Sequence, residues 1–127
     1  MVVFIRSWQC MTKEAHLLLA HGSRDPEWRL PFEILAADLK AIHPERPIRL
    51  CYLELWHPML TDAIQEEYGR GIRNFRISPL FWSRGRHLRE DLPRLVDAVM
   101  IPGMHIRIDG PLGLNEEVLR AALTALT

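Results

Sequence analysis

The fold class of this chain is decided by the stretch AHLLLAHG at residues 15–22, in which an apolar run stops at a histidine and a glycine. A short apolar run bounded by a turn residue is typical of a strand that is buried on both faces of a parallel sheet. Two more runs of this kind follow at about 47–54 and 74–81, and an alternating segment at about 104–109 predicts a fourth strand at an edge. We therefore expect strands that alternate with helices along the whole chain.

Helical periodicity fills the intervals between these strands. The first interval predicts a helix that starts near Pro31 and stops before Pro44, because proline is tolerated only in a first helical turn. Its apolar stripe has members three and four residues apart, namely Leu30, Ile34, Leu35, Leu39 and Ile42. Further helices are expected after Pro58, after Asp91 and after the capping residue Asn115. The last helix is expected to face inward with Val118, Leu119, Ala122, Leu123 and Leu126.

The predicted architecture is α/β, a single open, mainly parallel four-stranded sheet with helices on both faces. Residues 15–127 form this domain, and no internal repeat or linker divides it. Residues 1–14 precede the pattern and are expected to be an N-terminal extension, either disordered or an added edge strand. Parallel strands place the loops that follow them along one edge, where open α/β sheets bind their ligands.

The composition argues against several functional classes. Sixteen Lys and Arg residues balance 16 Asp and Glu residues, and a formal net charge of zero argues against non-specific nucleic-acid binding. No apolar stretch approaches the roughly 20 residues of a membrane span, and the first residues lack the pattern of a signal peptide. Cys10 and Cys51 fit no metal or disulfide framework. We therefore expect a cytoplasmic protein with neither a membrane nor a nucleic-acid partner.

Three ionisable residues each lie just past a predicted strand. His21 follows the first strand, Glu54 closes the second, and His87 lies shortly after the third. We expect all three at the carboxyl edge, where two imidazoles and a carboxylate are suitable ligands for a divalent metal ion. Beside His21, Gly22 permits a sharp turn with close backbone approach, and Arg24 adds a fixed positive charge.

Each of these residues also has a purely structural interpretation. A histidine at a strand end often serves only as a hydrogen-bonding residue, so His21 alone does not establish a ligand site. Glu54 is flanked by large apolar residues, and burial among them would raise its pKa and suit it to accept a proton. The alternative for Glu54 is a salt-bridged strand end. His57 is either an auxiliary contact or a loop residue, and Trp56 and Trp82 either form walls for a planar ligand or pack against helices.

The loop around His87 is basic, because Arg84, Arg86 and Arg89 lie within a few residues of it. In a chain without net charge, such a loop at the binding edge predicts an anionic ligand that carries carboxylate or phosphate groups. The alternative for any single arginine is a solvated side chain in a loop that precedes a helix.

Several motifs occur in one order along the chain: LLAHGSR at 18–24, YLEL at 52–55 with Pro58, PLF at 79–81 with GRH at 85–87, DLP at 91–93 and PLG at 111–113. Together they resemble the short sirohydrochlorin chelatases, which are the small CbiX-type members of the class II chelatases. The likeness covers about residues 15–126. Separated motifs in a fixed order are far more specific than any one of them alone.

This resemblance implies an ATP-independent enzyme without an organic cofactor. Its substrates would be sirohydrochlorin or a related tetrapyrrole and a divalent ion, cobalt foremost, with nickel or iron as alternatives, on the way to cobalamin or a related product. His21 and His87 would hold or guide the ion, and Glu54 would complete the metal site or accept the pyrrole protons. The substrate carboxylates would be bound by Arg24, Arg84, Arg86, Arg89 and Ser23. Longer relatives contain two such half-units, so the resemblance also implies a homodimer.

Two other functions compete with this one. A tetrapyrrole or metal carrier without turnover would use the same histidines and glutamate. A hydrolase that uses Ser23 and a histidine is the weaker alternative, because Ser23 lacks the Gly-x-Ser-x-Gly motif. Only the enzyme would raise the rate of metal insertion when it is present in substoichiometric amounts.

Overall fold

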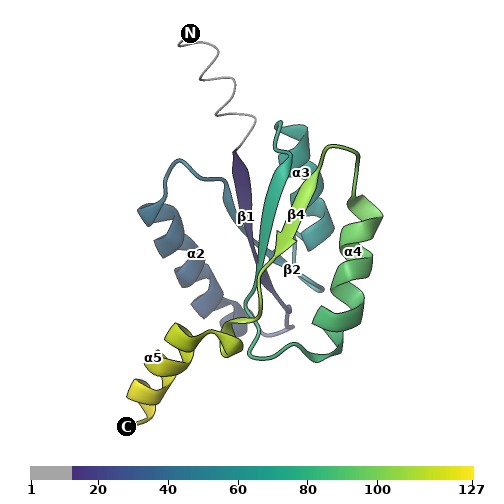
Figure 1. Cartoon of the computed structure of the whole chain (residues 1–127). Coiled ribbons are helices and arrows are strands. Elements are labelled where there is room, and N and C mark those ends of the chain that lie inside the picture. Colours follow the sequence, from purple (N-terminus) through teal and green to yellow (C-terminus); the bar gives the residue numbers. More distant parts are fainter. Residues whose placement is uncertain (1–12) are drawn as a thin grey trace.

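The computed structural model describes residues 13–127, with the exception of the His87 side chain. Its centre is a four-stranded sheet with strand order β2-β1-β3-β4, and every strand pairing is parallel (Figure 1). The strands are β1 (Glu14–Ala20), β2 (Ile48–Tyr52), β3 (Asn74–Pro79) and β4 (His105–Ile108). The predicted α/β class with one open parallel sheet is confirmed, and β4 is the edge strand that the alternating pattern predicted.

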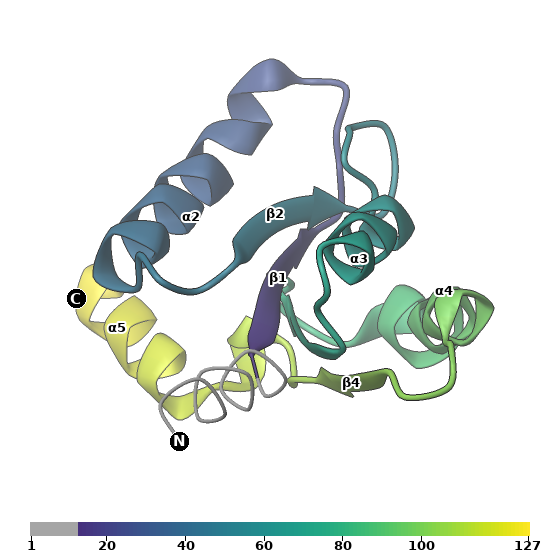
Figure 2. The same cartoon turned by 90° about the horizontal axis from the view of Figure 1, so that it is seen from above.

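Helices fill the intervals between the strands and follow the last one. The α-helices are α2 (Leu30–Ile42), α3 (Leu60–Gly69), α4 (Leu92–Val99) and α5 (Glu116–Leu126). Three of them are preceded by short helical turns: η1 (Pro26–Arg29), the π-helical turn η2 (His87–Asp91) and η3 (Leu112–Leu114). Figure 2 shows α2 on one face of the sheet and α3 and α4 on the other. Helices on both faces were expected, so the layer order is also as predicted.

The face under α3 and α4 holds the main hydrophobic core. From the sheet it receives Leu17, Leu19, Phe75 and Ile77, which are all fully buried. The two helices add Leu60, Ala63, Ile64, Leu92 and Val96. The opposite face holds only a small cluster, formed by Leu18, Ala36 and Ile48 under α2.

Most helix ends follow the signals in the sequence. Pro31 lies in the first turn of α2, and that helix ends before Pro44. Asn115 caps α5 as predicted, because its side-chain oxygen accepts hydrogen bonds from the backbone N–H groups two and three residues further on. Asp91 directly precedes α4 but forms no side-chain capping bond, since the turn η2 runs into the helix without a break.

The apolar stripe predicted for α2 is only partly buried. Ala36 is buried in the small cluster, and Leu39 packs against it. The helix contacts the sheet mainly at β2, so only a narrow strip of its surface is covered. The rest of the stripe is exposed and consists of Leu30, Ile34, Leu35 and Ile42.

The expectation that α5 faces inward is wrong. No residue of α5 is buried, and Leu119, Leu123 and Leu126 are 44%, 65% and 85% exposed. The helix lies on the same side of the sheet as α2 but extends beyond the carboxyl ends of the strands (Figure 1). Its contacts with the chain are mainly to η3, the turn directly before it. Amphipathic periodicity was correct for the helix itself and gave no information on what covers its apolar side.

A chain of polar side chains occupies the sheet face beside α2. Ser78 Oγ–H donates to Asp109 Oδ2 at 2.6 Å, and Arg76 Nε–H donates to the same oxygen at 2.8 Å. Since the ionised carboxylate has no proton to give, the Ser78 oxygen accepts its other hydrogen bond from His16 Nε2–H, at 2.7 Å. Burial, followed by the nearby charge of Arg76, lowers the pKa of His16. This network joins β1, β3 and the end of β4 through a neutral imidazole.

The expected N-terminal extension lies almost wholly outside the described residues, which begin at Lys13. β1 starts at Glu14, so the domain boundary proposed at residue 15 stays a prediction. None of the helices within residues 13–127 has the length and apolar character needed to span a membrane.

Candidate functional site

The carboxyl edge of the sheet brings three loops together. Because β1, β2 and β3 are parallel, the loops that follow them begin at the same edge, as predicted. Backbone hydrogen bonds extend the pairing past the strands, since Glu54 N–H donates to the His21 oxygen at 3.1 Å and Leu80 N–H donates to the Leu19 oxygen at 2.8 Å. The loop of His21 is therefore held directly between the loops that carry Glu54 and His87.

Gly22 allows the first two loops to touch. Its φ is +105°, and a Cβ at this position would lie only 2.0 Å from the backbone oxygen of Glu54. Any other residue would therefore be strained and would push the loops apart. The indole Nε1–H of Trp56 also donates a hydrogen bond to the Ser23 carbonyl oxygen. Trp56 thus ties the Glu54 loop to the His21 loop, a role that neither of the two sequence interpretations of this residue had named.

His21 lies beside an aromatic hollow. Its half-buried ring stacks on Phe81, with the ring centroids 4.8 Å apart and the planes inclined by 20°. The hollow has a volume of about 350 Å³ and is lined by His21, Arg84 and five largely apolar side chains: Trp28, Phe32, Leu80, Phe81 and Trp82. Such a lining suits a flat, mostly apolar ligand that carries acidic substituents.

Trp28 and Phe32 were missed by the sequence reasoning. Their rings lie 4.6 Å apart between centroids, and both face the hollow of His21. The signal was present, because aromatic residues four apart at the start of a helix share one helical face. The neighbouring Arg29 places its guanidinium 4.0 Å from the ring of Trp56, which adds a cation–π contact between the same two loops.

Glu54 lies at the predicted edge but is not buried. β2 ends at Tyr52, and the chain then turns outward through Leu55, whose φ is +69°. Both Glu54 and Leu55 are exposed. The expected burial of Glu54 among its apolar neighbours is therefore wrong, because the turn exposes the whole Glu54–Leu55 step. An exposed carboxylate at this position is able to exchange protons with water.

His87 is placed only through its backbone. It begins the π-helical turn η2, directly after the loop that leaves β3. Its side chain lies outside the described part of the structure, so the convergence of His21, Glu54 and His87 on one metal ion stays a prediction. Within residues 13–127, and without the His87 side chain, no three His, Cys, Asp or Glu residues are grouped so as to hold a metal ion.

Arg84 is the basic residue that lies against the aromatic hollow. It lines the hollow of His21 and also borders a second hollow of about 400 Å³, together with Arg89. Arg89 donates from Nε–H to the backbone oxygen of Gly85 at 3.3 Å, so its side chain follows the turn η2. The predicted basic loop therefore supplies at least one cation directly at the binding edge.

The other proposed substrate contacts lie further out. Arg24 is exposed in the loop after β1. Arg86 is 81% exposed at its side chain and approaches Glu90 within 3.9 Å, which is a weak surface ion pair. Ser23 is half-buried, and its Oγ accepts a hydrogen bond from the backbone N–H of Asp25 at 3.2 Å. Ser23 therefore shapes its own loop, whatever else it contacts.

The segment before α5 is locked to the loop after β3. Gly113 N–H donates to the Phe81 backbone oxygen at 3.2 Å. A Cβ on Gly113 would lie 1.6 Å from the backbone oxygen of Trp82, so the position admits only glycine. The PLG motif at 111–113 thereby fixes Phe81 and Trp82 beside the hollow.

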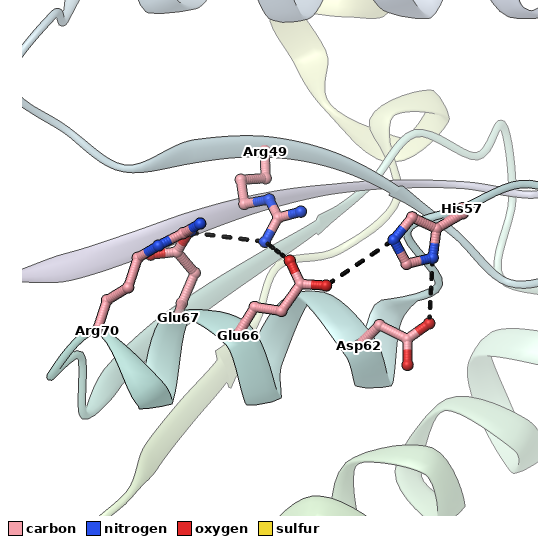
Figure 3. Close-up of polar contacts among 6 residues, drawn as sticks. All are labelled: Arg49, His57, Asp62, Glu66, Glu67 and Arg70. Atoms are coloured by element: carbon pink, nitrogen blue, oxygen red, sulfur yellow. Dashed lines mark hydrogen bonds and ion pairs between the residues drawn. The ribbon is translucent and has the colours of Figure 1, made fainter.

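His57 lies beside Asp62 and Glu66 of α3 (Figure 3), and it is not one of the residues that line the hollow. Its Nδ1 lies 3.6 Å from Asp62 Oδ2, and its Nε2 lies 3.8 Å from Glu66 Oε1. The two carboxylates approach opposite nitrogens of one ring, so the three groups do not share a single metal position. Arg49 donates to Glu66 at 2.6 Å, and this hydrogen bond lowers the pKa of the glutamate. His57 therefore contacts carboxylates on the surface of α3, next to the Arg49–Glu66 ion pair.

Comparison with known proteins gives a consistent set of similarities. The family model described as CbiX matches residues 15–127. A sirohydrochlorin cobaltochelatase of Saccharolobus solfataricus is 31% identical over 110 residues, which cover 80% of this chain and 84% of that protein. A second one, from Sulfurisphaera tokodaii, is 28% identical over 102 residues, with 80% and 82% covered.

Solved structures with this fold include one chain of similar length and one of which this chain covers about half. A protein described as the cobalamin (vitamin B12) biosynthesis CbiX protein from Marinobacter aquaeolei is 32% identical, with a TM-score of 0.75 and with 91% of this chain and 93% of that chain covered. SirB from Bacillus subtilis, solved with Fe³⁺, is 24% identical with a TM-score of 0.78, which shows a shared fold. This chain covers only 46% of that SirB chain, so it corresponds to about half of it.

Proposed function

Because this chain belongs to the CbiX family, as its motifs indicated, we propose that it inserts a divalent metal ion into sirohydrochlorin or a related tetrapyrrole. The enzyme class that the sequence predicted, a metal chelatase resembling sirohydrochlorin cobaltochelatase, is confirmed by the named relatives. One observation carries the specific proposal: the His21 loop is clamped between two other edge loops beside a hollow with aromatic walls. A planar macrocycle with acidic substituents matches those walls and the adjacent Arg84.

The proposed chemistry divides metal transfer and proton removal between different groups. Inserting M²⁺ into a tetrapyrrole forms bonds from the ion to the ring nitrogens and releases two pyrrole protons. Neutral imidazole binds first-row divalent ions and releases them again, so His21 and His87 hold or guide the ion on its way to the ring. Glu54, as an exposed carboxylate at the same edge, accepts pyrrole protons and passes them to water. Its carboxylate oxygens are also suitable ligands to complete the metal site.

Substrate binding is assigned mainly to the basic loop after β3. Arg84 would pair with the tetrapyrrole carboxylates from its place at the hollow, and Arg89 would act from the adjoining hollow. The remaining contacts are assigned to the outer residues Arg24, Arg86 and Ser23. Arg86 would have to exchange its weak pairing with Glu90 for the substrate.

Cobalt is the metal that we propose first. The relatives above are named cobaltochelatases, and SirB from Bacillus subtilis has been solved with Fe³⁺ and, in a subspecies spizizenii structure, with cobalt. Nickel and iron(II) are the alternatives. A site of nitrogen and oxygen ligands binds divalent ions in one general order of affinity, and this order alone does not select a single ion. We further propose that insertion needs no ATP and that residues 15–127 are the catalytic unit. The product enters cobalamin or related tetrapyrrole biosynthesis in the cytoplasm. The enzyme is proposed to act as a homodimer.

The test is a rate measurement on the whole chain. Sirohydrochlorin and Co²⁺ are mixed with substoichiometric protein, and the absorbance change of the macrocycle is followed. We expect turnover for the natural sequence and a loss of at least about 100-fold for His21→Ala and for His87→Ala, the scale of lost general acid–base or ligand groups. The matched control is His57→Ala, which removes a histidine of the same edge that faces α3 and should keep the rate.

Each outcome of this assay assigns the protein. Turnover that survives in the double variant lacking both His21 and His87 would remove these residues from the mechanism. Stoichiometric binding of sirohydrochlorin or Co²⁺ without turnover would identify a carrier instead of an enzyme.

A further inference from the structure

Leu55 has a backbone conformation that leucine rarely adopts. Its φ is +69°, and among the described residues it is the only one other than glycine with a positive φ. The Trp56 backbone N–H donates to the Glu54 backbone oxygen at 2.8 Å, which closes a three-residue turn around Leu55. This is a γ-turn with a positive central φ, the rare and strained form of that turn.

Packing of the leucine side chain does not explain this conformation. Leu55 is 57% exposed, so its side chain gains little from burial that would offset the strain. A strained residue of this kind persists only where the surrounding structure holds it, and such residues cluster at active sites. Leu55 directly follows Glu54, the proton acceptor of the proposed function. The contacts at the two ends of the turn therefore have to account for it.

Both ends of the turn are tied to the loop that carries His21. The Glu54 backbone N–H donates to the His21 backbone oxygen at 3.1 Å. On the other side of Leu55, the indole Nε1–H of Trp56 donates to the Ser23 backbone oxygen. The residue before Leu55 and the residue after it are thus bonded to the same neighbouring loop, which leaves Leu55 little freedom to relax.

The Trp56 ring is itself anchored to regular secondary structure. The guanidinium carbon of Arg29 lies 4.0 Å from the ring centroid, and the Tyr52 ring lies 6.5 Å away between centroids. Arg29 directly precedes α2, and Tyr52 is the buried last residue of β2. Contacts with two such elements allow the indole to act against the strain at Leu55.

The turn also determines where the Glu54 side chain leaves its loop. A Cβ on Gly22 would lie 3.5 Å from Glu54 Cγ, so this side chain starts beside the residue that follows His21. A negative φ at Leu55 would open the turn and would change the direction in which the Glu54 side chain leaves. Strain at Leu55 and the placement of the Glu54 carboxylate are therefore coupled.

We propose that Trp56 is a positioning residue for Glu54, because its indole holds Leu55 in the strained turn and this turn fixes the Glu54 carboxylate beside the His21 loop. The inference rests on the proposed function, in which Glu54 accepts the pyrrole protons. A general base has to lie within hydrogen-bonding reach of the proton that it removes. The role requires an indole and not merely an aromatic ring, since the decisive contact is the Nε1–H bond to Ser23.

The first experiment tests the strained turn without any assay of function. Leu55→Gly and Leu55→Ala are compared by urea denaturation, and the glycine variant should be the more stable, because glycine adopts a positive φ without steric cost. Met100 provides the matched control, since it is an exposed residue directly after α4 with an ordinary φ of −64°. There the alanine variant should be the more stable. The same order at position 55 would overturn the strained turn.

The second experiment measures the tie by NMR, as hydrogen exchange of the backbone N–H of residue 56, corrected for intrinsic exchange rates. Trp56→Phe keeps a ring for Arg29 but removes the indole N–H, so exchange should become faster. Adding Leu55→Gly removes the opposing strain and should slow the exchange again. Unchanged exchange in Trp56→Phe would overturn the role of the indole. A double variant that exchanges at least as fast as Trp56→Phe would show that Leu55 does not oppose the tie.

The third experiment connects the turn to the chemistry. Trp56→Phe should lower kcat for metal insertion by at least about 10-fold, the scale of a small misplacement of a reacting group. KM should change by less than about twofold, because the turn holds a proton acceptor and not the substrate. Leu55→Gly should restore part of the lost kcat in the double variant. The matched control is His57→Ala, which alters the next residue, contacts only α3 carboxylates among the described ion pairs and should keep both constants.

The outcomes separate this inference from the proposed function. A natural chain without turnover would remove the proposed function and with it the catalytic role of the turn. Turnover with an unchanged kcat in Trp56→Phe would leave the proposed function standing and overturn the positioning role. A change in KM alone would also overturn it, because Trp56 would then be a substrate contact.

Discussion

The two faces of the sheet differ in how completely their side chains are buried. The face under α3 and α4 is closed, apolar and made of fully buried side chains such as Leu17 and Phe75. The face beside α2 combines a small cluster, an open groove and a hydrogen-bonded polar network. Most of the burial that stabilises the fold therefore lies on the first face. The second face keeps the polar and apolar surfaces that a partner or ligand can use.

The largest expected effect is on the closed face. Phe75→Ala removes a fully buried ring from the centre of the core, and it should lower the free energy of unfolding by about 3–5 kcal/mol. Urea denaturation monitored by circular dichroism measures this loss. A cost below about 1 kcal/mol would mean that the main core lies elsewhere.

A smaller effect is expected at the carboxyl edge, where both faces end. Gly22 and Gly71 have nearly the same φ, +105° and +100°. A Cβ on Gly22 would lie 2.0 Å from the Glu54 backbone oxygen, whereas a Cβ on Gly71 would have no described atom within 4 Å. Gly22→Ala should therefore cost about 1–3 kcal/mol more in unfolding free energy than Gly71→Ala. It should also slow metal insertion, because the His21 and Glu54 loops must separate.

Gly71→Ala is the control in that comparison, since it carries the conformational strain without the collision. Equal stability losses in the two variants would show that the loops yield easily and that Gly22 is not what holds them together.

The open face should show its polar network through pH. His16 has a lowered pKa in the folded chain, because burial and the Arg76 charge disfavour its protonated form. The unfolded chain therefore binds more protons as pH falls below about 6.5, and the stability supplied by neutral His16 is lost from there downward. The pKa of Asp109 is lowered as well: its burial opposes this, but the hydrogen bonds from Ser78 and Arg76 outweigh the burial. The contribution of Asp109 to the free energy of unfolding is therefore lost only at more acidic pH, below about 3.8.

Unfolding curves taken between about pH 7.5 and about pH 5 measure the contribution of His16. We expect a His16→Gln variant to be less stable at neutral pH and to show a flatter slope over this range. A slope as steep as that of the natural chain would assign the pH dependence to other groups.

The sequence predicted the parts of this structure that depend on local pattern. Apolar runs and helical spacing located each strand and α-helix that the structure describes within residues 13–127, and the parallel order then placed His21 and Glu54 at one edge. Exposure was harder to predict. The outward turn at Leu55 exposes Glu54 between its apolar neighbours, and nothing in the local pattern signals a positive φ at a leucine.

Helical periodicity also identifies an apolar side without saying what covers it. The pattern of α5 resembles that of a core helix, yet Leu123 is exposed, because the fixed contact of Gly113 with Trp82 directs the helix away from the sheet. The aromatic wall of Trp28 and Phe32 was missed for a related reason, since their four-residue spacing is equally typical of packing residues.

The smallest expected effect is on the exposed stripe of α2, and it tests whether this stripe is exposed in the single chain. Ile34→Ala removes a side chain that is 52% exposed, so in the dissociated chain it should change the unfolding free energy by no more than about 0.5 kcal/mol. If the proposed homodimer buries the exposed stripe of α2, the same variant should lose more stability as the protein concentration rises, because dimer formation adds to the apparent stability by mass action. Thermal unfolding at several concentrations separates the two contributions. A large loss that is independent of concentration would show that α2 is buried within one chain, and the distinction between a closed and an open face would then not hold.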